Sequence, residues 1–170
     1  MRFSRRGTNC SPSADPSIAG YCRQWGLGWL SAALECRGCA AVWRTVFQEV
    51  TQGTCVLLVA RDAGQIVGSV QLALATKPNA RHRAEVQKLF VLSSQRRRGI
   101  GRALMHVVEQ VARSGGRALL VLDTRQGDSA EQLYRTLGYC EVGVIPAYAR
   151  GASGTLDSTV IFYKTLPIVE

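Results

Sequence analysis

The sequence predicts an α/β fold of the α+β type, in which a β-sheet is flanked by helices. From residue 55 onward, runs rich in Val, Leu and Ile and bounded by turn residues indicate strands. Between them, two segments repeat apolar residues at the three- and four-residue spacing of amphipathic helices. The 170 residues, 46% of them hydrophobic, match the usual size of one domain and suffice for one core.

The N-terminal part of the chain has a less regular pattern. Residues 1–20 carry Ser, Pro, Gly and Arg without a period, and no ordinary first strand is evident there. We expect residues 1–39 to form an irregular or atypical segment, and residues 40–170 to form the domain.

The expected elements of the domain follow one another with short connections. A hairpin turn is indicated by Asp62-Ala63-Gly64, and the apolar run Arg117–Thr124 is typical of a strand buried on both faces. Asp128 with Glu131, or Ser129 with Gln132, can form a capping box at a helix start. In order, we expect a helix over 40–50, two strands within 55–74, a strand over 84–92, a helix over 99–114, a strand over 117–124, a helix from 128 or 129, and strands over 139–145 and 158–166.

Charge and composition narrow the classes of ligand and compartment. The net charge of +9 favours acidic ligands such as phosphates, nucleic acid or an anionic surface, without choosing among them. No apolar run approaches the roughly 20 residues of a membrane span. The basic start is not followed by the apolar stretch of a secretory signal. We therefore expect a cytoplasmic protein without membrane association, with reduced thiols for its six cysteines.

No metal site is expected from the cysteines. Cys36 and Cys39 form a lone CxxC pair without a second pair or a nearby histidine. A zinc site needs about four ligands.

The turn before the first long amphipathic helix combines arginines with two glycines. The first turn of a helix has backbone N–H groups without partners and a partial positive charge, so phosphate binds there readily. Gly99 and Gly101 would let a phosphate approach the backbone, and arginine adds a permanent, fork-shaped charge. In the alternative interpretation, Gly99 only allows the turn, Gly101 only packs the helix against the sheet, and the arginines only solvate a loop. A P-loop and a dinucleotide-binding turn are excluded, because GxxxxGK[ST] and GxGxxG are both absent.

The segment Arg96-Arg97-Arg98-Gly99-Ile100-Gly101 resembles the [Q/R]-x-x-G-x-[G/A] motif of the GNAT superfamily of acetyl-CoA-dependent N-acetyltransferases. The later stretch "AEQLYRTLGY" resembles a second signature of that family through Ala130, Leu133, Tyr134, Gly138 and Tyr139, although Gly127 stands where an Asn is often found. Over residues 40–166, "RAEVQKLFVL", "LLVLDT" and "IFYKTL" look similar to the tabtoxin-resistance-type branch. The resemblance implies a mixed central sheet of about six to seven strands, with the first strand uncertain.

The resemblance implies acetyl-CoA as co-substrate and no metal. Backbone N–H groups near Arg97 to Arg102 would bind the pyrophosphate, and one of the arginines would reach the 3′-phosphate. Main-chain groups of the preceding strand would pair with the pantetheine arm, and one of its N–H groups would polarise the thioester carbonyl. The implied cofactor-binding residues are Leu89, Phe90, Val91, Leu92, Arg96, Arg97, Arg98, Gly99, Ile100, Gly101, Arg102 and Tyr134.

Catalytic candidates come from the same resemblance. Glu85, 11 positions before Arg96, stands at the spacing of the base in some family members. The alternative for Glu85 is an ion pair with Arg83 or Lys88. Asp123 is the second candidate base. Tyr134 stands at the family position of the acid that protonates the CoA thiolate, with simple core packing as its alternative.

Several functions are consistent with these residues. The favoured one is acetyl transfer to a primary amine of a small molecule, such as a toxin or antibiotic, with detoxification or resistance as the outcome. The alternatives are acetylation of a protein amine and a non-catalytic acyl-CoA-binding protein. Nucleic acid is not expected as a partner, because the basic cluster is short and lacks interleaved aromatics. A homodimer is left open.

Overall fold

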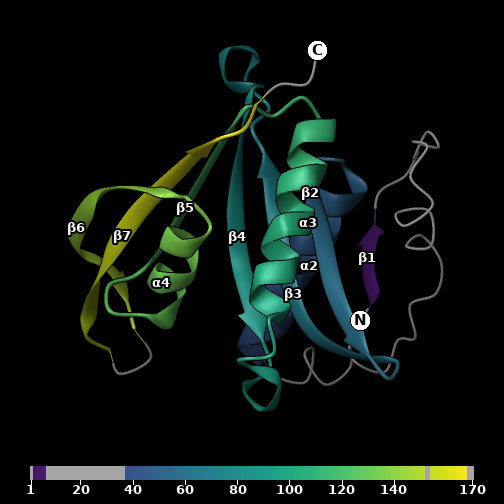
Figure 1. Ribbon diagram of the computed structural model, residues 1–170, viewed down its shortest axis with the longest axis horizontal. Coiled ribbons are helices and arrows are strands. Elements are labelled where there is room, and N and C mark those ends of the chain that lie inside the picture. Colours follow the sequence, from purple (N-terminus) through teal and green to yellow (C-terminus); the bar gives the residue numbers. More distant parts are fainter. Residues whose placement is uncertain (1, 7–36, 152–153, 168–170) are drawn as a thin grey trace.

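The computed structural model describes residues 2–6, 37–151 and 154–167, which form a seven-stranded sheet with helices on both faces (Figure 1). The strand order is β1-β2-β3-β4-β5-β7-β6, and only the β4–β5 pair is parallel. The elements are β1 (Arg2–Arg6), α2 (Arg37–Thr51), β2 (Cys55–Asp62), β3 (Gln65–Leu74), β4 (Arg83–Val91), α3 (Ile100–Ser114), β5 (Leu119–Arg125), α4 (Ser129–Thr136), β6 (Cys140–Arg150) and β7 (Leu156–Thr165), with short 3-10 turns at Pro78–Ala80 and Ser93–Gln95.

Most of the expected elements are confirmed, since their signals are local. Ala63 and Gly64 both have positive φ, 46° and 82°, which gives the tight hairpin between β2 and β3. Helix α3 begins after Gly99 and ends at Gly115, as the glycines predict. The last two strands are longer than expected, because the β6–β7 pairing continues to Arg150 and Leu156.

The expectation for the N-terminus was wrong at its start. Arg2–Arg6 forms β1, which pairs antiparallel with β2 from Arg2↔Arg61 to Arg6↔Leu57. An edge strand needs only one partner and is commonly polar, so "RFSRR" shows no alternation to predict it. The CxxC motif lies partly outside the described residues.

The sheet carries a separate apolar cluster on each face. Side chains of α3 and α4 pack on one face, here called the α3 face, around buried Leu104, Val108, Leu120 and Phe162. On the opposite face, here called the α2 face, Val46 and Val50 contact a smaller cluster built on β2. The buried residues of the smaller cluster are Val46, Val50, Cys55, Leu57, Val59 and Ile66.

The expectation that the 117–124 strand is buried on both faces was also wrong. Leu120 and Leu122 are buried under α3 and α4, whereas Val121 is half-buried and Asp123 is exposed. Because side chains alternate along a strand, β5 therefore leaves its α2 face open. The apolar run cannot reveal this, since Val121 is apolar on the open face as well.

A buried ion pair ties α3 to the last strand. Glu109 is only 3% exposed, and Lys164 of β7 donates to both of its carboxylate oxygens at 2.9 Å. Lys164 also donates to the Leu137 carbonyl at 2.7 Å, at the end of α4. Such a pair is costly to break on one side only, so it fixes α3 relative to α4 and β7.

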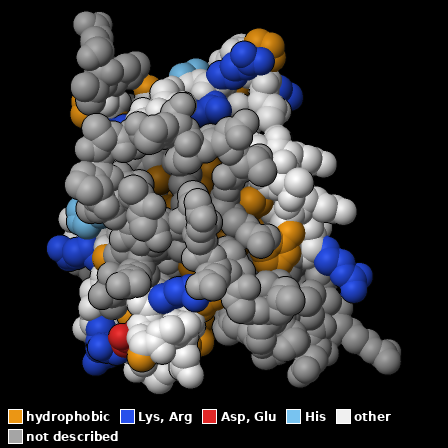
Figure 2. Space-filling model, turned by 90° about the vertical axis from the view of Figure 1, so that its right-hand side faces the viewer, with side chains coloured by type: hydrophobic (Ala, Val, Ile, Leu, Met, Phe, Trp, Pro, Cys, Tyr) orange, Lys and Arg blue, Asp and Glu red, His pale blue; other side chains and the backbone are white. Residues whose placement is uncertain are grey.

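Basic side chains dominate the charge of the surface. On the face that Figure 2 shows, Lys and Arg side chains are spread over the described surface and acidic ones are rare. This agrees with the net charge of +9. No helix within the described ranges combines the length and apolarity needed to cross a membrane.

Gly68 sets how closely α3 approaches β3, which yields a test of the packing. A Cβ at Gly68 would lie 2.8 Å from the Phe90 carbonyl oxygen and 3.2 Å from Leu104 Cδ1. We expect Gly68→Ala to lower the free energy of unfolding by about 1–3 kcal/mol, measured by urea denaturation. Gly101→Ala is the control, because its Cβ would make only ordinary contact with Leu133 at 3.4 Å. Equal stability of the two variants would contradict this account.

Candidate active site

The central feature of the site is a gap between two neighbouring strands. The parallel β4–β5 pairing consists of Arg83↔Leu119, Ala84↔Leu120 and Glu85↔Val121 and extends no further. Beyond these pairs the strands diverge, and β5 continues against β7 (Figure 1). The divergence exposes strand edges within the sheet, where backbone groups can accept a ligand as an added strand would bind.

A β-bulge in β4 lies beside this gap. Gln71 pairs with Gln87 and Ser69 with Phe90, so two residues of β4, Lys88 and Leu89, face Val70. Lys88 adopts a left-handed φ of 49°. A bulge leaves its extra residue out of the hydrogen-bonding ladder and re-aims the following side chains. Nothing in the apolar pattern of the strand predicts it.

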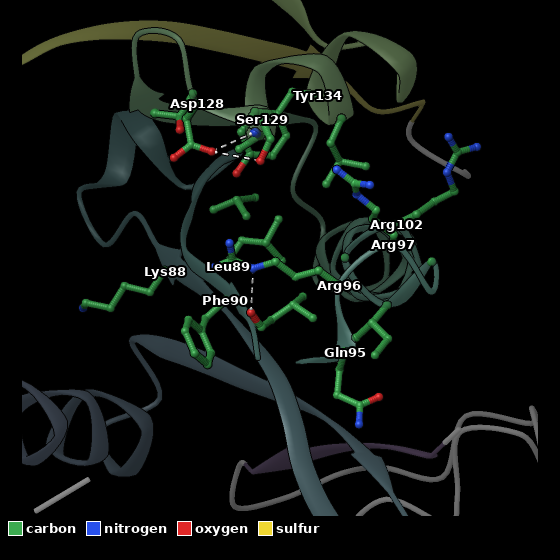
Figure 3. Close-up of a pocket in the computed structure, with 18 of the residues that line it drawn as sticks. Lys88, Leu89, Phe90, Gln95, Arg96, Arg97, Arg102, Asp128, Ser129 and Tyr134 are labelled. Carbon is green, nitrogen blue, oxygen red and sulfur yellow. Dashed lines mark hydrogen bonds between the residues drawn. The ribbon is translucent and has the colours of Figure 1, made fainter. Parts of the chain in front are cut away.

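A pocket of about 780 Å³ occupies the gap (Figure 3). Its volume is in the range of sites for drug-sized ligands. The lining comes from β4, the arginine turn, the end of β5 and the start of α4. The expected site residues in the lining are Leu89, Phe90, Val91, Arg96, Arg97, Gly99, Ile100, Gly101, Arg102, Asp123 and Tyr134. Leu92, Arg98 and Glu85 are not among the lining residues.

One end of the pocket is formed by the N-terminus of α3. Arg97 and Gly99 have left-handed φ values of 60° and 78°, which bend the chain sharply before the helix. Gly99 supplies no side-chain cap, and no acidic residue stands in the first turn. By contrast, Asp128 caps α4 by accepting a hydrogen bond from the Ala130 N–H at 3.0 Å. The first turn of α3 therefore keeps its N–H groups and partial positive charge available for an anion.

The arginines of this turn divide into two pairs. Arg98 forms an ion pair with Asp62 at 3.1 Å and also contacts Gln95, and Arg96 Nε donates to the Val91 carbonyl at 3.2 Å. Arg97 and Arg102 make no ion pair or hydrogen bond within the described residues. Figure 3 shows both extending from the start of α3 toward the side of α4.

The two glycines of the turn have different physical roles. A Cβ at Gly99 would enter open space, so its left-handed φ is the reason for glycine there. A Cβ at Gly101 would lie 3.4 Å from Leu133 and 3.9 Å from Val91, which are ordinary contact distances, so packing alone does not require glycine there. Both residues line the pocket.

Tyr134 closes the other side of the pocket from α4. Its ring is 5% exposed and contacts the rings of Tyr139 and Phe162, with centroids 5.9 and 5.8 Å away. Burial, and then the carboxylates of Asp128 and Asp123, raise the pKa of Tyr134 to about 12. The phenol therefore stays protonated at neutral pH and keeps its proton available for donation.

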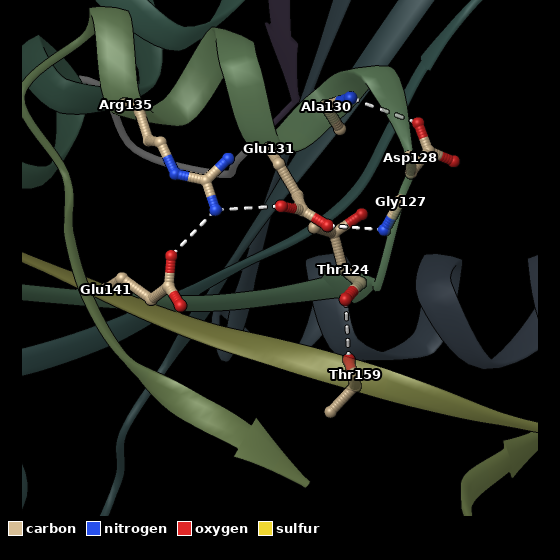
Figure 4. A network of polar contacts seen from close by, with 8 residues as sticks. All are labelled: Thr124, Gly127, Asp128, Ala130, Glu131, Arg135, Glu141 and Thr159. Atoms are coloured by element: carbon tan, nitrogen blue, oxygen red, sulfur yellow. Dashed lines mark hydrogen bonds and ion pairs between the residues drawn. The ribbon is translucent and has the colours of Figure 1, made fainter. Parts of the chain in front are cut away.

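Asp123 is held at the mouth of the gap by a neighbouring strand. The Thr159 hydroxyl of β7 lies 2.9 Å from Asp123 Oδ2. It also lies 2.8 Å from the Thr124 carbonyl oxygen, and Figure 4 shows this second contact. Thr159 is 3% exposed, so its position is fixed by packing. Asp123 itself is exposed and lines the pocket.

Glu85 lies on the same face as Asp123 but outside the pocket lining. It is exposed on β4, opposite Val121, and Asp123 follows two residues later on β5. No ion pair joins Glu85 to Arg83 or Lys88. Lys88 instead donates a hydrogen bond to Gln71 at 3.2 Å. Figure 3 shows the Lys88 side chain directed away from the pocket.

The start of α4 is braced by a polar network (Figure 4). The Gly127 N–H donates to Glu131 at 2.5 Å, and Arg135 binds both Glu131 at 2.8 Å and Glu141 at 2.7 Å. The capping box expected from Asp128 and Glu131 is therefore present in a modified form, because Glu131 binds the N–H one residue before the cap. This network holds the turn that carries the pocket wall from β5 to Tyr134.

A family model described as Acetyltransferase (GNAT) family matches residues 21–139. The chain belongs to the GNAT acetyltransferase family. Enzymes of this family use acetyl-CoA as co-substrate, and the uncapped helix with free arginines is suited to its phosphates.

Two curated relatives are similar in sequence to part of this GNAT protein. It is 36% identical over 94 residues to N-acetyltransferase 8 from Homo sapiens, covering 54% of this chain and 41% of that protein. It is 34% identical over 92 residues to an IAA acetyltransferase from Azospirillum brasilense, covering 54% and 58% of the two chains. The matched part thus spans about half the length of these curated relatives.

A solved structure supports the GNAT fold. An acetyltransferase of the GNAT family from Streptococcus pneumoniae superimposes with a TM-score of 0.62 over 66% of this chain and 68% of the other, at 20% identity. Within the described part of this GNAT chain, no three His, Cys, Asp or Glu side chains are grouped closely enough to hold a metal ion.

Three features of the GNAT site were not anticipated from the sequence. These are the Lys88–Leu89 bulge, the support of Asp123 by Thr159, and the sequestering of Arg98 by Asp62. Only the last has a sequence signal, since Arg98 is one of four arginines in one short segment.

Proposed function

We propose that this protein transfers the acetyl group of acetyl-CoA to a primary amine of a small molecule. The observation that carries the proposal is one pocket that joins an uncapped, arginine-lined helix start to a tyrosine and an aspartate in the gap between β4 and β5. A small acceptor is supported by the likeness to a relative named IAA acetyltransferase. The resemblance to tabtoxin-resistance-type enzymes extends the proposal to detoxification of a toxin or antibiotic.

The cofactor-binding residues follow from the free groups of the turn. N–H groups of Arg97 to Arg102 would hold the pyrophosphate, because the left-handed residues and the missing cap leave them open. Arg97 and Arg102 would bind the 3′-phosphate, since Arg96 and Arg98 already have partners. Backbone groups of Leu89 to Val91, freed by the bulge and the divergence, would bind the pantetheine arm and polarise the thioester carbonyl.

Two side chains would move the protons. Asp123 would take a proton from the substrate ammonium, directly or through water, and so free the lone pair for attack. Tyr134 would give its proton to the leaving sulfur while the new C–N bond forms and the C–S bond breaks. The second proton, which the nitrogen loses as the amide forms, would restore the Tyr134 phenol. The products are an N-acetyl amide and the free thiol of CoA. Glu85, on the same face as Asp123, would attract the ammonium and is the alternative base.

The assignment of the arginines can be tested with two nucleotides. Arg97→Gln and Arg102→Gln should each weaken CoA binding about tenfold or more, because a charged hydrogen bond is worth roughly 1.5–3 kcal/mol. The affinity of both variants for 3′-dephospho-CoA should be almost the same as that of the parent protein. Isothermal titration calorimetry measures the affinities for both nucleotides. Arg98→Gln is the control and should not discriminate between the two ligands. Equal losses for both nucleotides would remove the 3′-phosphate assignment.

The role of Tyr134 can be tested by removing only its hydroxyl. Tyr134→Phe should lower kcat by about a hundredfold or more while CoA affinity is retained, since the ring packing is preserved. Because burial raises the pKa of Tyr134 to about 12, the parent rate should not fall through its ionisation until the pH approaches that value. Tyr148→Phe, at an exposed position on β6, is the control. Undiminished turnover in Tyr134→Phe would leave the residue with a packing role only.

The identity of the base can be tested by comparing two isosteric variants. Asp123→Asn should lower kcat/KM for a high-pKa amine by about 10²–10⁴-fold near neutral pH, because the amide cannot take a proton. The gap to the parent should narrow as the pH rises and more of the amine is already unprotonated. Glu85→Gln should have a smaller effect that does not narrow in this way. The reverse pattern would make Glu85 the base, and pH-independent losses in both would assign the carboxylates to binding alone.

A further inference from the structure

The strand register places two carboxylates and several apolar side chains on one open face. Glu85 lies opposite Val121, which lies opposite Tyr163 of β7. In the next row on this face, Asp123 lies opposite Ile161, which lies opposite Gly143 of β6. Directly paired residues project on the same side of a sheet. Since the alternating residues of β5 and β7 are buried under α3 and α4, these rows belong to the α2 face.

The apolar members of these rows are accessible. Tyr163 is 37% exposed, and Ile145, which pairs with Thr159 in the following row, is 43% exposed. Val121 and Ile161 are half-buried between them. A Cβ at Gly143 would meet no atom within 4 Å, so open space lies beside Gly143 in this row. Helix α2 lies on the same face but packs its buried residues on β2, near the edge of the sheet opposite to β7 and β6. We call Val121, Ile145, Ile161 and Tyr163 the apolar wall.

The carboxylates beside the apolar wall have no cationic partner. Neither Glu85 nor Asp123 forms an ion pair within the described residues, and Asp123 receives only the Thr159 hydroxyl. Of the neighbouring cations, Arg125 pairs with Asp157 at 3.8 Å and Lys88 donates to Gln71. Arg83 lies two positions before Glu85 on the same face of β4, is exposed and makes no ion pair in the described part of the chain. Two unpaired carboxylates next to an exposed apolar surface complement a cation attached to an apolar body.

The wall is continuous with the pocket. Asp123 both lines the pocket and stands in the row of Ile161, so one residue connects the reaction end of the pocket to the apolar wall. An ammonium held at Asp123 would place its substituent over Val121, Ile161 and Tyr163. A second copy of the chain would also cover the wall, and the sedimentation measurement below distinguishes that occupant.

We propose that the acceptor is a primary amine that carries an aromatic or other large apolar group on a short linker. Its ammonium is held by Asp123 and Glu85, and its apolar group lies on the wall formed by Val121, Ile145, Ile161 and Tyr163. This inference rests on the proposed acetyl transfer and specifies the substrate class for the same site.

The matched amines for the test are 2-phenylethylamine and ethylamine, which differ only in the phenyl group. The aromatic amine should be acetylated with a kcat/KM at least about tenfold higher, because the contact of one apolar group with a pocket wall is worth about tenfold or more in discrimination. Calorimetry with the complex of the protein and CoA, which cannot transfer acetyl, should show the same preference in Kd.

Adjacent residues of β6 offer a matched pair of variants. Ile145 and Val144 are both 43% exposed, but Ile145 pairs with Thr159 on the α2 face and Val144 with the buried Val160 on the α3 face. Ile145→Ser should reduce the preference for 2-phenylethylamine over ethylamine about threefold or more. Val144→Ser should leave this preference unchanged. Calorimetric affinities of the two variants should follow the same order.

The outcomes separate this inference from the proposed function. If no amine is acetylated although CoA binds, the proposed function fails. If both amines are acetylated with equal kcat/KM, or if Ile145→Ser and Val144→Ser behave alike, acetyl transfer stands and the aromatic acceptor is ruled out. If Ile145→Ser changes the sedimentation of the protein rather than its amine preference, the wall is an interface between copies and the inference is overturned.

Discussion

The short parallel contact between β4 and β5 is the constraint on which the rest of the molecule depends. Three residue pairs join the two strands, after which each strand is anchored elsewhere, β4 to β3 and β5 to β7. The sheet therefore consists of two parts that are joined only by these three pairs, the last of which is Glu85 with Val121. The backbone edges that face each other across the gap are too far apart to pair, so they must be satisfied by water or by a ligand. Closing the gap would require breaking the longer ladders on either side.

The two ends of the gap between β4 and β5 carry opposite charge. The start of α3 and the free arginines make one end positive, whereas Asp123 and Glu85 make the other end negative. This polarity suits a phosphate-bearing ligand at one end of the gap and a cationic group at the other. Since the polarity comes from a helix terminus and from strand residues, it is set by the fold and needs no conformational change to appear.

The sequence predicted the parts of this protein whose signals are local. The hairpin at Asp62–Gly64, helix α3 and the arginine turn were found because turn residues and a helical stripe occur within a few positions of one another. Strand β1 was missed, since five residues with three arginines become a strand only by pairing with β2. The open face of β5 was also missed, because an apolar strand looks the same whether one or both faces are covered. That error concealed the surface beside Asp123.

The sequence predicted which residues lie at the candidate site but not which role each residue has. The family resemblance identified four arginines together, and only the tertiary contacts with Asp62 and the Val91 carbonyl separate Arg98 and Arg96 from Arg97 and Arg102. Likewise, Glu85 and Asp123 are both carboxylates on strands in the sequence. Their difference arises from the bulge and from Thr159, which involve residues distant in the chain.

The missing cap of α3 has a consequence for the energetics of the whole protein. A helix of 15 residues that packs against β2, β3 and β4 begins with a glycine that offers no acceptor to its first N–H groups. An anion bound there would complete the helix in the way that Asp128 completes α4. An anion that binds only the folded protein would therefore add to the free energy of unfolding, by an amount that grows with the ligand concentration. In such a protein, ligand binding and folding are linked equilibria, so a higher ligand concentration raises the stability of the fold.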